Sequence, residues 1–196
     1  DIDYLHGYFP SLTKLDMSQA SIVAGGDSYH QWKVASDGTA TKNTSYAYNT
    51  ENDIVGGYMF YNMPLLEKVV LPQGVTKVGT YAFDKCPRLA EIDPFPTTVT
   101  QIGDYAFRGC SALQSITLPE TLESIGAYAF SSCSALQSIT LPETLKSLGN
   151  SAFYLCSSLK SVSIPGSLES IPAHAFSSCS ALSSVKLNDG LVNIGP

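Results

Sequence analysis

Residues 111–133 read SALQSITLPETLESIGAYAFSSC, and this stretch is the clearest copy of a unit that recurs along most of the chain. Its phenylalanine has counterparts at intervals of 23 or 24 residues, at Phe60, Phe83, Phe107, Phe130, Phe153 and Phe176. A fixed period of this length is the sequence signature of a solenoid, in which each copy stacks on its neighbours. The repeat therefore decides the fold.

Further slots of the unit are apolar in nearly every copy. LxxIxLP has apolar residues at positions 1, 4 and 6, and its last three residues alternate as they do in a strand. This pattern predicts one strand per copy, and LxxIG predicts a second, shorter extended piece that glycine ends. The AYAFSSC segment is too short for a stable α-helix, so we expect a single helical or 3₁₀ turn there. Each copy is then one coil of a β-rich spring with parallel strands.

The pattern LxxIxLPxxLxxIGxxAFxxC, which covers residues 58–196, resembles the BspA-like, or treponemal-type, leucine-rich repeat of bacterial surface proteins. The resemblance implies the α/β leucine-rich-repeat class and a right-handed parallel solenoid with coils of about 23 residues. It also implies export to the cell surface and a role in binding or adhesion rather than catalysis. It implies no particular partner.

We expect one leucine-rich-repeat domain over residues 1–196, with a cap at 1–57 and six tandem repeats at 58–196, the last incomplete. The cap contains an incomplete first coil around FPSLTKLDMS and a polar, aromatic insertion at 23–53. The second full unit has one extra residue near Pro94–Pro96. An insertion there predicts a bulge, and Phe95 either fills the core, which we favour, or faces outward.

Charge and hydropathy argue against nucleic acid as a partner and against a transmembrane segment. The formal net charge is -6, the pI is about 4.9, and no run of basic residues is present to neutralise phosphates, so nucleic acid is excluded. No apolar stretch approaches the ~18 to 20 residues of a membrane span, so we expect no transmembrane segment. We expect an extracellular or cell-surface protein that is anchored through a segment outside these residues.

The pattern of the five cysteines indicates a role in core packing rather than in disulfides or metal binding. All occupy one repeat slot, where Met63 replaces them once, so we predict a ladder of buried thiols rather than disulfides or a metal site. His174 shares the slot of Tyr81, Tyr105 and Tyr128, which favours a structural role. His6 and His30 have no catalytic spacing, and no nucleophile motif surrounds any serine. We therefore expect no enzyme, no cofactor and no metal.

Candidate binding residues occupy the outward positions of the predicted strands and the insertion. Those of the strands are Lys68, Glu91, Asp93, Ser115, Thr117, Ser138, Thr140, Ser161, Ser163 and Lys186, and those of the insertion are Tyr29 and Trp32. The strand residues form a ladder that is charged at its N-terminal side and rich in hydroxyls beyond it. Such a ladder either binds a ligand through many hydrogen bonds or simply keeps the sheet soluble. The aromatic residues of the insertion either contact a ligand or cover the first coil.

These features predict a non-catalytic adhesion module that binds an unknown protein or glycan ligand, with protein–protein interaction on the strand face as the first hypothesis. One alternative is a glycan-binding module in which Trp32 and neighbouring tyrosines stack on sugar rings. Another is a structural spacer that presents a different domain.

Overall fold

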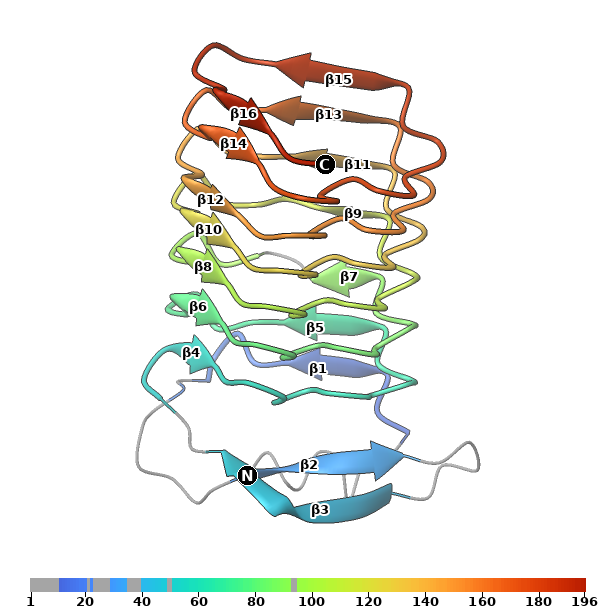
Figure 1. The fold of residues 1–196 in the computed structure, drawn as a ribbon. Helices are drawn as coiled ribbons and strands as arrows, with labels where there is room; N and C mark the ends of the chain where they lie inside the picture. Colours follow the sequence, from blue (N-terminus) through green and yellow to red (C-terminus); the bar gives the residue numbers. More distant parts are fainter. Residues whose placement is uncertain (1–10, 21, 23–28, 35–39, 49–50, 93–94) are drawn as a thin grey trace.

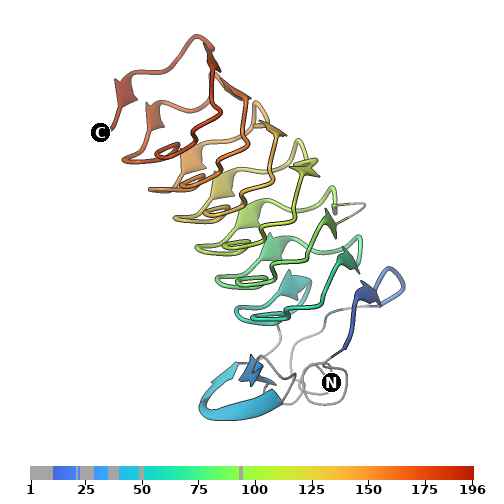
Figure 2. The same cartoon turned by 90° about the vertical axis from the view of Figure 1, so that its right-hand side faces the viewer.

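The computed structural model describes residues 11–20, 22, 29–34, 40–48, 51–92 and 95–196. Within 29–34 and 40–48 the description is of the backbone. The chain winds into a stack of similar coils that follow one axis from the N-terminal to the C-terminal end (Figures 1 and 2). Each coil contributes two short strands and a segment of turns, so the coil is the unit from which the surfaces are built.

Two families of parallel strands run along the stack. The first family, from LxxIxLP, consists of β1 (Lys14–Asp16), β5 (Lys68–Val70), β7 (Glu91–Ile92), β9 (Ser115–Ile116), β11 (Ser138–Thr140), β13 (Ser161–Ile164) and β15 (Ser184–Leu187). The second family, from LxxIG, consists of β4 (Ile54–Val55), β6 (Lys77–Val78), β8 (Gln101–Ile102), β10 (Ser124–Ile125), β12 (Ser147–Leu148), β14 (Ser170–Ile171) and β16 (Asn193–Ile194). Both predicted strands of the unit are confirmed.

The register of the strands follows the repeat. Ile139 lies opposite Ile116 on one side and Val162 on the other, so equal slots meet in neighbouring coils. β1 joins β5 in the same way, with Leu15 opposite Val69. Side chains alternate across a strand, and neighbouring strands are in register. The same repeat positions therefore point inward and are buried in every coil. The parallel stacking of the copies is therefore confirmed, whereas the handedness of the coil stays a prediction.

An antiparallel pair of strands, β2 (Tyr29–Val34) and β3 (Ala40–Tyr48), lies at the N-terminal end of the stack (Figure 1). The pair falls within the insertion that the sequence places at 23–53. The expected bulge near Pro94 lies outside the described residues in part, since 93–94 are not described. Phe95 is 7% exposed and its ring lies 6.4 Å from that of Phe107, so its predicted place in the core is confirmed.

The prediction of a helical or 3₁₀ turn in each coil is not supported, and the described residues contain no helix, so the α/β label does not apply to them. The AYAFSSC segment instead forms successive turns. Two of its slots have a positive φ, for example Tyr128 at 54° and Ser132 at 61°, and a right-handed helix cannot pass through such residues. Alternate backbone N–H groups donate to the next coil, as Phe130 N does to the Ala152 carbonyl at 2.8 Å, whereas Ala129 N and Ser131 N donate to carbonyls of their own coil. Hydrogen bonds between coils therefore alternate with turn hydrogen bonds within the coil.

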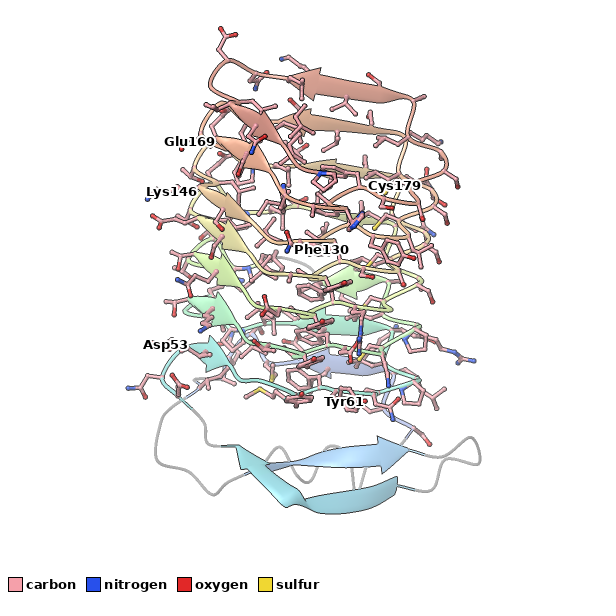
Figure 3. The ribbon with its side chains drawn as sticks, in the orientation of Figure 1. Asp53, Tyr61, Phe130, Lys146, Glu169 and Cys179 are labelled. Carbon is pink, nitrogen blue, oxygen red and sulfur yellow. The ribbon has the colours of Figure 1, made fainter. Side chains whose placement is uncertain are left out.

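The core consists of ladders in which identical side chains stack. The phenylalanine rings from Phe60 to Phe176 are spaced by 4.9 to 5.4 Å and are nearly parallel. Figure 3 shows Phe130 inside the stack, whereas Lys146 and Glu169 lie at its outer edge. The predicted leucine, isoleucine and valine slots are buried through the central coils. Stability therefore comes from contacts between neighbouring coils, as in other solenoids.

The thiol slot behaves as predicted, because all five cysteines are buried and free. Each thiol donates to the phenylalanine carbonyl of the preceding coil, for example Cys133 Sγ to the Phe107 oxygen at 3.2 Å and Cys86 Sγ to the Phe60 oxygen at 3.0 Å. Burial raises the pKa of Cys86 and Cys133 from the ordinary value of 9.0 to about 12. The thiols of Cys86 and Cys133 therefore stay protonated and donate their hydrogen bonds.

This raised pKa predicts alkaline destabilisation. Folded Cys86 and Cys133 hold their protons to about pH 12, whereas the same thiols in the unfolded chain release them near 9.0. Their contribution to stability is therefore complete below pH 9 and falls as the pH rises from 9 toward 12. Urea unfolding at pH 8, 9.5 and 10.5 measures this, and we expect a smaller alkaline loss in Cys86→Ala/Cys133→Ala. An equal loss in both proteins contradicts the assignment.

The last coil is less protected than those in the middle of the stack. Val185, Leu187 and Ile194 are 47%, 50% and 61% exposed, and they border an open apolar depression of about 470 Å³ with Phe176 and Leu182.

Candidate binding surface

The strand face is the outer surface of the first strand family, and the register brings the predicted hydroxyls into two rows. Ser115, Ser138 and Ser161 lie opposite one another across β9, β11 and β13, and Thr140 lies opposite Ser163. Every member of these rows is exposed, apart from Ser163, which is partly buried. Each coil therefore presents serine or threonine hydroxyls at the spacing of neighbouring strands, ~4.8 Å.

Charged residues border the rows at both ends. Lys68 lies opposite Glu91 in β5 and β7, and the two side chains form an ion pair. Lys186 lies opposite Ser163 at the C-terminal side, and Thr117 is exposed just after β9. The structure thus brings the strand-derived candidates other than Asp93 onto one face, with charge at the ends and uncharged hydroxyls between them.

Three candidates are not placed on this face. Asp93 lies outside the described residues. The backbones of Tyr29 and Trp32 belong to β2, where Trp32 pairs with Lys42, but their side chains also lie outside the description. The two interpretations of the aromatic insertion, as ligand contact or as cover for the first coil, therefore both stay predictions.

A second surface feature was missed as a candidate site. Tyr58, Tyr81, Tyr105 and Tyr128, which we call the tyrosine ladder, stack with ring centroids 4.6, 4.7 and 5.0 Å apart. All four side chains are partly exposed. Burial raises the pKa of Tyr105 above its ordinary value, so its hydroxyl stays protonated and can donate. The signal in the sequence is the recurrence of tyrosine in the slot that His174 shares.

A buried ion pair accompanies the ladder. Asp84 is fully buried and accepts two hydrogen bonds from Arg108, at 2.8 Å from Nε and 2.7 Å from Nη2. This pairing holds the guanidinium over the rings of Tyr105 and Tyr81, at 4.7 and 5.6 Å from the centroids. Bidentate pairs of this kind fix orientation as well as charge. Asp84 therefore positions Arg108 against the ladder.

The described residues contain no group of three or more His, Cys, Asp or Glu side chains that could hold a metal ion. In the same part of the chain no helix is long and apolar enough to cross a membrane. The geometry of the surface is thus one of exposed hydrogen-bonding groups on a rigid stack.

Parallel coils of about 23 residues, each with one principal strand and a stacked apolar interior, define a leucine-rich-repeat solenoid. The model of the BspA type leucine rich repeat region matches residues 53–157 and 94–196, with six copies. The chain therefore belongs to the BspA-type leucine-rich repeat family.

Solved structures of bacterial leucine-rich repeat proteins resemble this one. The Treponema pallidum leucine rich repeat protein shares 27% identity at a TM-score of 0.71, over 85% of this chain and 83% of its own. A protein from Bacteroides ovatus shares 25% identity at 0.60, over 88% of this chain and 55% of its own. One from Eubacterium ventriosum shares 27% at 0.55, over 81% and 40%. No curated protein matches the chain significantly.

Leucine-rich-repeat proteins commonly mediate protein–protein interactions and are generally non-catalytic. BspA-type members are typically bacterial surface proteins. These statements hold for the family. For this chain, the identity of the partner and the surface that binds it are left to determine.

Proposed function

We propose that this protein is a cell-surface or secreted adhesion module that binds another protein through its strand face, with residues 1–57 as a cap and 58–196 as the binding solenoid. The observation that carries the proposal is the pair of exposed hydroxyl rows in register on β9, β11 and β13. The rows repeat one pattern of donors and acceptors over several coils on a rigid support, and rigid presentation lowers the entropic cost of binding.

The charged ends of the face support a specific orientation for the partner. The Lys68–Glu91 pair lies at one end and Lys186 at the other, with uncharged hydroxyls between them. Charges at the rim of an interface steer association and fix register more than they add affinity. The proposed partner therefore contacts the central coils through hydrogen bonds and is oriented by the ends.

The test compares two matched pairs of substitutions in the same coils. Ser138→Arg/Ser161→Arg crowds the strand face on β11 and β13, whereas Ser147→Arg/Ser170→Arg places the same side chains on β12 and β14, and all four serines are exposed. Each protein is immobilised and incubated with detergent-solubilised epithelial surface proteins, and the retained proteins are quantified by mass spectrometry. We expect the strand-face variant to lose at least nine tenths of each protein that wild type retains specifically, and the matched variant to keep them.

Retention of the same proteins by both variants contradicts the strand face as the binding surface. A glycan array separates the alternative functions. Binding to a glycan that Trp32→Ala abolishes favours the insertion as a sugar-binding site, and the absence of any specific protein or glycan ligand favours a spacer.

A further inference from the structure

The tyrosine ladder is not required by the fold of the coil. Its slot is held by Ser151 and His174 in the next two coils, and both keep the same left-handed conformation, with φ of 56° and 55° against 56° for Tyr105. A left-handed backbone disfavours bulky side chains, so local preference does not explain four tyrosines there either. We therefore ask which ligand the rings could contact.

The stacking decides which parts of the rings a ligand can reach. Tyr81 and Tyr105 each lie between two neighbouring rings, at interplanar angles of 19° or less, so both of their faces are covered. Their hydroxyl groups remain, together with the parts of their edges that Arg108 does not contact. Among the described residues the hydroxyls of Tyr81, Tyr105 and Tyr128 have no hydrogen-bond partner, and each can donate one bond and accept others. The ladder is thus a row of phenol groups and not a flat aromatic platform.

The shape and charge of the row restrict the ligand. The row is one ring wide, so its area is far smaller than the ~800 Å² per partner that an ordinary protein interface buries. The charge of Arg108 is balanced by Asp84, and Asp104 lies beside Tyr105 in sequence, so the row has no excess of positive charge for an acidic polymer. A thin, uncharged chain with hydroxyls at regular intervals matches these features.

We propose that the tyrosine ladder binds an extended, neutral polysaccharide that lies parallel to the axis of the stack. The hydroxyls of Tyr81, Tyr105 and Tyr128 exchange hydrogen bonds with successive sugar residues, since one coil step is about the length of a pyranose unit in an extended chain. The guanidinium of Arg108 uses Nε and Nη2 for Asp84, which leaves Nη1 to donate to the same polymer. A β-1,4-glucan has the required straight form, whereas the α-1,4 linkage of starch coils the chain.

This surface is separate from the strand face, and the inference does not rest on the proposed protein binding. The test is native gel electrophoresis of the whole chain through gels that contain hydroxyethyl cellulose, a soluble β-1,4-glucan, or soluble starch. We expect hydroxyethyl cellulose to retard wild type and starch to leave its mobility unchanged. The triple variant Tyr81→Phe/Tyr105→Phe/Tyr128→Phe keeps the stack and removes three hydroxyls, so we expect at least tenfold weaker binding to hydroxyethyl cellulose.

The controls separate this site from the others. Trp32→Ala and Ser138→Arg/Ser161→Arg should bind the glucan as wild type does, because they alter the insertion and the strand face. Tyr128→Ser puts into one coil the residue that the next coil has at Ser151, so it tests the row with a side chain the fold already accepts, and we expect weaker binding. Wild type that runs unretarded in hydroxyethyl cellulose overturns the proposal. Unchanged binding by the triple variant overturns it as well, as does equal retardation by starch.

Discussion

Replacing Cys133 by aspartate is expected to abolish cooperative folding of the coils on either side of it. The Cys133 side chain is fully buried, and its Sγ donates to the carbonyl oxygen of Phe107. A carboxylate in that slot faces an acceptor where the thiol donates, and it has no cation within the thiol ladder. An uncompensated buried charge costs about 3 to 5 kcal/mol, which is a large part of the stability of a typical domain.

Circular dichroism during urea unfolding and hydrogen exchange of the central coils measure this effect. Cys133→Ala is the matched control, because it leaves a small cavity and no charge, and we expect it to cost about 1 kcal/mol. A cooperatively folded Cys133→Asp protein with nearly the midpoint of wild type would show that the slot is not dry.

The second large effect is expected from Arg108→Ala. This substitution leaves the fully buried carboxylate of Asp84 without its bidentate partner, although the carboxylate previously accepted two charge-assisted hydrogen bonds. Removing one member of a buried pair costs about 3 kcal/mol or more, because the remaining charge stays desolvated. The loss of the guanidinium from the rings of Tyr81 and Tyr105 adds a smaller amount.

The repeat itself supplies the control for Arg108→Ala. Two other coils have serine in the slot of Asp84 and Arg108, at Ser131 and Ser177. We therefore expect Asp84→Ser/Arg108→Ser to be more stable than Arg108→Ala in urea unfolding, because it removes the charge together with its partner. A double variant that is less stable than the single one contradicts the view that the orphaned carboxylate causes the loss.

The strands, their register and the thiol ladder could be predicted because each depends on a side-chain pattern that repeats. Apolar residues at fixed slots must meet in a stack, and the positions of Ile139 and Cys133 follow directly. The two hydroxyl rows follow from the same register. The Asp84–Arg108 pair could also have been predicted, since the two residues occupy one slot in adjacent coils and carry opposite charges.

The turns could not be predicted, because their conformation is set by bonds between coils and not by residue type. Tyr128, Leu155 and Lys85 all have a positive φ, although none of them favours it, and only Gly109 and Asn62 in the slot of Lys85 give the expected signal. The strain is held by neighbouring coils, whose carbonyls accept hydrogen bonds from the N–H groups of these same three residues. A single copy of the repeat contains no trace of this constraint.

The identical side chains that stack within the core have a consequence for the ancestry of the molecule. Since Phe130 meets Phe107 and Phe153 in the same way, an in-frame duplication or deletion of 23 residues joins one coil to another without leaving a cavity or a misfit. Recombination between copies therefore changes the length of the solenoid by whole coils and preserves the packing of its core.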